Sequence, residues 1–143
     1  MSVSNGLFTI KLYEMERAFG HLQGRLQLCQ TADLEKIRRE IELANDEFLE
    51  VEMLLKRAAE RSRTPLVAEL AQAQEAFNKK TQTCLQQALD STDELDAQAE
   101  VAAVCAEFAI DQAIQAMNYA LLSALNAIER QLAANESMKE EQL

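Results

Sequence analysis

The sequence predicts an all-α fold, a single-domain antiparallel bundle of four long helices with coiled-coil-like packing. First, apolar residues recur at alternating spacings of three and four along most of the chain, which places them on one helical face. Second, turn formers are scarce, with 3 Gly and 1 Pro. Third, hydrophobic residues make up 48% of the chain, too many for a disordered protein. At 143 residues, the chain matches one domain, so we assign 1–143 to a single helical bundle.

The first helix is expected over about 4–29. Its apolar seam repeats without a miss and consists of Phe8, Leu12, Met15, Phe19, Leu22, Leu26 and Cys29. Gly20 and Gly24 lie inside this helix, where each glycine costs about 1 kcal/mol relative to alanine. We expect a packing reason for them, namely a close crossing by the alanine-rich helix at 92–134.

The second helix is expected over 32–62. Thr31 or Asp33 can cap its first turn, because either side chain can accept a hydrogen bond from a free amide. Its seam has the same heptad spacing and consists of Leu34, Ile37, Ile41, Ala44, Phe48, Val51, Leu55 and Ala58. The basic residues near its end, among them Arg57 and Arg61, suit the negative end of the helix dipole and do not by themselves indicate a phosphate site.

The third helix is expected over 65–89. Pro65 fits the first helical position and disfavours helix at Thr64, which can act as the cap. Its expected inner side consists of Leu66, Leu70, Ala73, Phe77, Cys84 and Ala88. Lys80 and Thr81 interrupt this stripe, so its register is the least regular of the four.

The fourth helix is expected over 92–134, followed by a frayed tail at 135–143. Ser91 and Glu94 have the spacing of a capping box at its start. Its apolar residues cover most of the circumference, and those at heptad spacing are Ile110, Ile114, Met117, Leu121, Ala124 and Ile128. Such a helix is expected to be the centre of the bundle or to pack against a second subunit.

Charge excludes several classes of partner. The formal net charge is −10, and residues 81–143 hold Arg130 and Lys139 against 11 acidic side chains. A phosphate-binding surface needs the opposite bias, so we expect neither nucleic acid nor an anionic membrane surface as a partner. The most apolar run, 112–128, contains too many polar residues for a lipid-spanning helix, so no membrane insertion is expected.

The cysteines and the first residues of the sequence point to the cytoplasm. Cys29, Cys84 and Cys105 are odd in number and have no metal-like spacing, so we expect reduced, buried thiols. Residues 1–19 lack both a basic leader and an unbroken apolar stretch, so no secretory signal is predicted.

No catalytic, metal or cofactor site is predicted. A di-iron carboxylate bundle needs a Glu-x-x-His pair on each of two helices, whereas this chain has only His21, with no glutamate three residues before it. His21 lies between Arg17 and Arg25 on one stripe and is expected at the surface. Glu107 and Asp111 are one turn apart and could act as an acid–base pair if buried, but a solvent-exposed strip is the favoured interpretation.

We therefore expect a non-enzymatic protein-interaction module: an adaptor, a chaperone-like protein or a self-assembling one. Its partner would be itself or another protein, and it would need no cofactor. The expected association face consists of Gly20, Gly24, Ile114, Met117, Leu121, Ala124 and Ile128. The alternative is a protein that binds an apolar small molecule or a lipid between its alanine-rich helices, where small side chains leave room.

Overall fold

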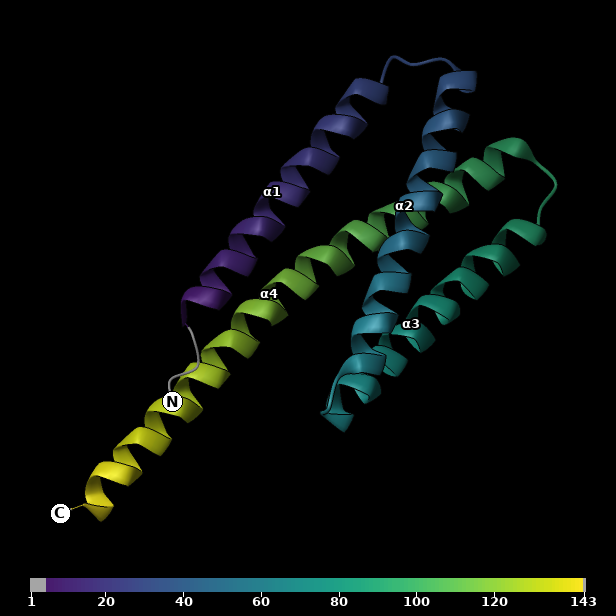
Figure 1. Ribbon diagram of the computed structural model, residues 1–143. Coiled ribbons are helices and arrows are strands. Elements are labelled where there is room, and N and C mark those ends of the chain that lie inside the picture. Colours follow the sequence, from purple (N-terminus) through teal and green to yellow (C-terminus); the bar gives the residue numbers. More distant parts are fainter. Residues whose placement is uncertain (1–4, 143) are drawn as a thin grey trace. The chain divides into compact units, whose positions relative to one another are not determined.

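The computed structural model describes residues 5–142, and over that range the chain contains helices and no strands (Figure 1). The elements are α1 (Asn5–Cys29), α2 (Leu34–Arg61), α3 (Pro65–Asp90) and α4 (Leu95–Glu141). Helix α2 contacts α3 after a short turn. The prediction of an all-α protein with four helices and packing between adjacent helices is confirmed. The expected start of the first helix at residue 4 lies outside the described residues.

The chain divides into two compact units. One contains α1 and the part of α4 from Glu107 onward, and the other spans residues 31–106, with α2, α3 and the beginning of α4. Helix α4 thus contributes to both units. The assignment of 1–143 to a single domain stays a prediction.

Asp33 determines where α2 begins. Its backbone is extended, and its Oδ1 accepts a hydrogen bond of 2.8 Å from the Lys36 amide. Of the two expected caps, Asp33 is therefore the one in use. Because the cap residue itself is not helical, α2 begins at Leu34 rather than at residue 32.

The turn between α2 and α3 combines a proline with a serine. Pro65 occupies the first position of α3, as expected. Thr64 precedes it with an extended backbone, but its hydroxyl makes no capping bond. Instead, the Thr64 amide donates to Ser62 Oγ at 3.2 Å, and the Ser62 amide donates to the Ala59 carbonyl at 3.2 Å. Thr64 is thus the N-cap residue of α3, as expected, but its side chain makes no capping bond.

The predicted capping box at Ser91 and Glu94 is also wrong. Helix α3 extends to Asp90, and Ser91 has an αR backbone rather than the extended conformation of an N-cap. Its hydroxyl donates to the Ala88 carbonyl at 2.7 Å and so closes α3. The Glu94 amide donates to Thr92 Oγ1 at 3.3 Å, and α4 begins one residue later, at Leu95.

Helix α4 is continuous over 47 residues, or about 70 Å at 1.5 Å per residue. The predicted frayed tail at 135–143 is wrong up to Glu141, and Leu143 lies outside the described residues. Most side chains in this segment favour helix. Gln131 Nε2 also donates to Asn135 Oδ1 at 3.1 Å, and Lys139 suits the dipole in the last turn.

Burial is slight throughout the described part of the chain. Ala59, at 9% exposure, is the one described residue that counts as buried. Cys29 and Cys105 are half-buried and Cys84 is exposed, so the three thiols are free, but the prediction that they are buried is wrong.

Helix α3 turns a different side inward from the one predicted. Of the expected inner residues only Ala88 is half-buried, whereas Leu66, Leu70 and Phe77 are exposed. The half-buried side instead carries mainly small and polar residues, namely Ala68, Ala71, Glu75, Asn78 and Thr81, with Leu85 and Leu89 toward its end. Alanines admit a neighbouring backbone closely, and the Thr81 hydroxyl is satisfied by the Asn78 carbonyl at 2.9 Å. Over the first part of α3, the half-buried side is therefore the one with the smaller side chains rather than the more apolar one.

Candidate association surfaces

Gly20 and Gly24 lie on α1, one turn apart, and no part of the described chain approaches them closely. A Cβ atom added at either position would meet no atom within 4 Å. The predicted close crossing of these glycines by the fourth helix is therefore wrong. Both glycines and the association residues of α4 belong to the same unit, but they do not form one contact.

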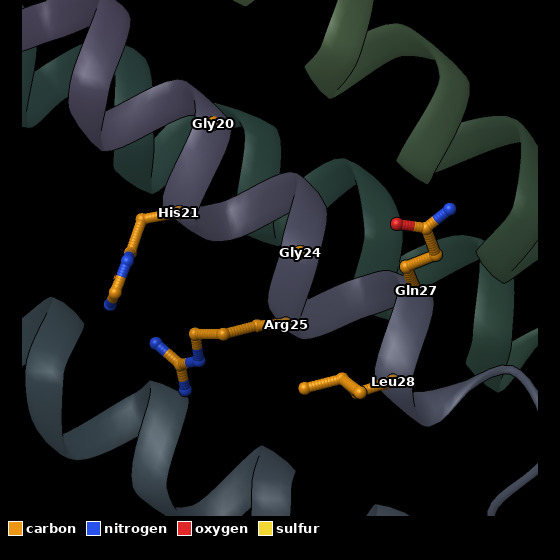
Figure 2. Close-up of a pocket in the computed structure, with 6 residues that line it drawn as sticks. All are labelled: Gly20, His21, Gly24, Arg25, Gln27 and Leu28. Carbon is orange, nitrogen blue, oxygen red and sulfur yellow. The ribbon is translucent and has the colours of Figure 1, made fainter.

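A hollow of about 510 Å³ lies along this glycine step (Figure 2). Its lining comes from one helix, with Gly20, His21, Gly24, Arg25, Gln27 and Leu28. In Figure 2, the side chains of His21, Arg25 and Leu28 project to one side of α1 and that of Gln27 to the other. The missing side chains of the glycines widen the hollow, which is an indentation of a helix surface rather than an enclosed cavity.

The expected association residues on α4 divide into two groups. Ile114 and Leu121 are 51% and 50% exposed, whereas Met117, Ala124 and Ile128 are half-buried. The more exposed pair lies seven residues apart, so it forms a stripe along one side of the helix. About half of each of these two side chains is open to solvent.

The candidate acid–base groups are on the surface. His21, Glu107 and Asp111 are all exposed. Exposure keeps the two carboxylates solvated, so the geometry supplies none of the burial that an acid–base pair requires. Among residues 5–142, no three side chains of His, Cys, Asp or Glu gather in a group that could hold a metal ion.

A further exposed apolar stripe lies on α2, which the predicted association face did not include. We call it the α2 seam, and it consists of Leu34, Ile37, Ile41, Ala44, Phe48, Val51, Leu55 and Ala58. All of these residues are exposed except Ile37, which is half-buried, and Leu55 is 63% exposed. The signal for this surface was present in the sequence, because the seam repeats with heptad spacing over its whole length. Spacing alone did not show that the seam stays uncovered.

Comparisons with known proteins identify no relative. No protein-family model, no curated protein and no solved structure matches this chain. Within the described residues, no helix contains an apolar stretch long enough to span a bilayer.

Proposed function

We propose that this protein is a non-enzymatic helical module that works by protein association, primarily with further copies of itself. The observation that carries the proposal is the exposure of large apolar side chains on all four helices, from Leu7 on α1 to Met138 on α4. Burial of apolar surface stabilises a protein by about 25 cal/mol per Å². Apolar stripes of this extent on a helical chain are therefore surfaces for association.

The arrangement of these residues supports a protein partner over a small ligand. They form long stripes at heptad spacing, which is the pattern that a second helix packs against. The hollow of about 510 Å³ at the glycine step is lined by one helix, and so is a second hollow on α1 of about 310 Å³, which is lined by Glu14, Arg17, Ala18 and His21. Ligand sites, by contrast, enclose most of their ligand's surface. Binding of an apolar molecule between alanine-rich helices is thus an outcome for the test to detect.

The charge of the chain restricts which other proteins it would bind. Residues 81–143 hold 11 acidic side chains and only Arg130 and Lys139. An adaptor or chaperone-like activity of this half would favour basic proteins, because complementary charge speeds encounter. Self-association has the stronger support, because the heptad seams need no additional partner to be covered.

Light scattering coupled to size-exclusion chromatography tests the proposal directly. We expect the purified chain to elute at a multiple of 16.0 kDa at micromolar concentration. A strict monomer with no change over a hundredfold range of concentration would contradict self-association. Native mass spectrometry of the same sample separates the alternative, since a retained apolar ligand adds mass to the monomer and a second copy doubles it.

A further inference from the structure

The α2 seam has the features of one strand of a two-stranded coiled coil. Apolar residues occupy both core positions of the heptad over 25 residues, from Leu34 to Ala58, and almost all of them are exposed. Three to four sustained heptads with charged flanking positions are typical of a coiled coil. The flanking charges then determine which partner fits and in which direction.

The seam is complementary to itself when a second copy runs antiparallel. Pairing Leu34 with Ala58 of the second copy, and Ile41 with Val51, places an apolar residue opposite an apolar residue at every core position. The same alignment sets Arg38 opposite Glu52 of the second copy. By the two-fold symmetry of the pair, each such contact occurs twice.

Flanking residues near the two ends of α2 add a second pair of attractive contacts. In this antiparallel alignment, Asp33 lies opposite Arg61 of the second copy, again twice. Asp33 caps α2 with Oδ1 only, so its other carboxylate oxygen can accept from a guanidinium. The one like-charge contact joins Glu47 to its own copy near the symmetry axis. The antiparallel pair therefore gains four attractive contacts against one repulsive contact.

A parallel pair of α2 helices has a worse balance of charge. In a parallel pair, the residue just before the first core position of each heptad, such as Asp33 or Glu47, faces the residue five positions further along in the other copy. Asp33 then faces Arg38, which is attractive, but Glu47 faces Glu52, which is repulsive, and both contacts occur twice. Like charges at these positions select against the wrong direction.

We infer that the α2 seam binds the α2 seam of a second copy of this chain, side by side and antiparallel, through the Arg38–Glu52 and Asp33–Arg61 contacts. This inference rests on the proposed self-association and names the surface that performs it. Arg38, Glu52 and Arg61 are exposed, so we expect charge changes at these positions to leave the fold of the monomer intact.

Charge reversal on the full-length chain tests the pairing, with sedimentation equilibrium as the measurement. Arg38→Glu and Glu52→Arg each replace two attractive contacts with two repulsive ones, and each should raise the dimer Kd about tenfold. The double variant restores opposite charges and should return the Kd to within about threefold of the wild type. Glu60→Arg is the matched control, because it changes the net charge as Glu52→Arg does but lies on the side of α2 away from the seam.

The outcomes separate this inference from the proposal beneath it. If the wild-type chain is a strict monomer, both fail. If the wild type associates but Arg38→Glu and Glu52→Arg behave like Glu60→Arg, the inference alone fails and association uses another surface. A tighter dimer in Glu52→Arg also overturns it, because only in a parallel pair would Glu47 face the introduced positive charge. Circular dichroism of every variant establishes that the helices are intact.

Discussion

Helices α1 and α2 carry the same apolar spacing but differ in how much of it is covered and in what flanks it. On α1, the first part of the seam (Phe8, Leu12 and Met15) is half-buried. On α2, nearly the whole seam is exposed. Heptad spacing thus shows that a helix has an apolar face, but it does not show whether the chain itself covers that face.

The flanking charges differ as well. An antiparallel pair of α1 helices that sets Phe8 opposite Leu26 would bring Lys11 against Arg25 of a second copy, which is repulsive. The α2 alignment instead sets opposite charges against each other. Like charges at such positions destabilise a pair by about as much as opposite charges stabilise it. The comparison therefore assigns self-association to α2. The apolar residues of its seam and the caps at the helix starts can each be tested by substitution.

The largest effect is expected from a charge in the middle of the α2 seam. Phe48→Asp removes a large apolar side chain, 49% exposed, and places a carboxylate in the pairing surface of both copies. Losing about 1.5 kcal/mol or more on each side should raise the dimer Kd by about a hundredfold or more in sedimentation equilibrium.

The matched control for Phe48→Asp is Leu22→Asp on the α1 seam, where the native side chain is 60% exposed. It introduces the same charge into a seam of the same spacing and should leave the dimer intact. Dissociation by Leu22→Asp with no effect of Phe48→Asp would reverse the assignment of the two helices.

The next effect concerns the glycines of α1. Because a Cβ atom at Gly20 or Gly24 meets nothing within 4 Å, alanine at both positions should stabilise the chain. The gain is about 1 kcal/mol for each substitution, since glycine is the poorer helix former, and urea unfolding measures it. Loss of association or of stability in Gly20→Ala or Gly24→Ala would show that another copy crosses α1 at this step.

The smallest effect concerns the helix starts. Asp33→Ala removes the bond to the Lys36 amide and should lower the free energy of unfolding by about 1 kcal/mol. Thr64→Ala should have little effect, because the Thr64 hydroxyl makes no capping bond at the start of α3. Asp33→Asn keeps a capping oxygen but removes the charge, so it should preserve monomer stability while weakening the dimer. If Asp33→Ala and Thr64→Ala lose the same free energy of unfolding in urea, the expected difference between the two caps is contradicted.

The sequence by itself determined the number and type of the elements. Pro65 marks the first residue of α3, Asp33 is one of two residues named in advance as the cap of α2, and the heptad spacing identified the seams. These signals were sufficient because helix propensity, proline geometry and capping act between residues close together in the chain. The exposure of His21 also followed from its place between Arg17 and Arg25, away from the seam.

Only the tertiary structure decided which of the helical faces are covered. It turned the small residues of α3 inward in place of Leu66, Leu70 and Phe77, left Gly20 and Gly24 uncrossed, and left the α2 seam exposed. It also decided that the Ser91 hydroxyl bonds to the last turn of α3, although the spacing of Ser91 and Glu94 fits a capping box for α4. The physical reason is that a helix of any given spacing can turn several faces toward a neighbour. The choice depends on how closely backbones approach, which is a property of contacts between residues distant in sequence.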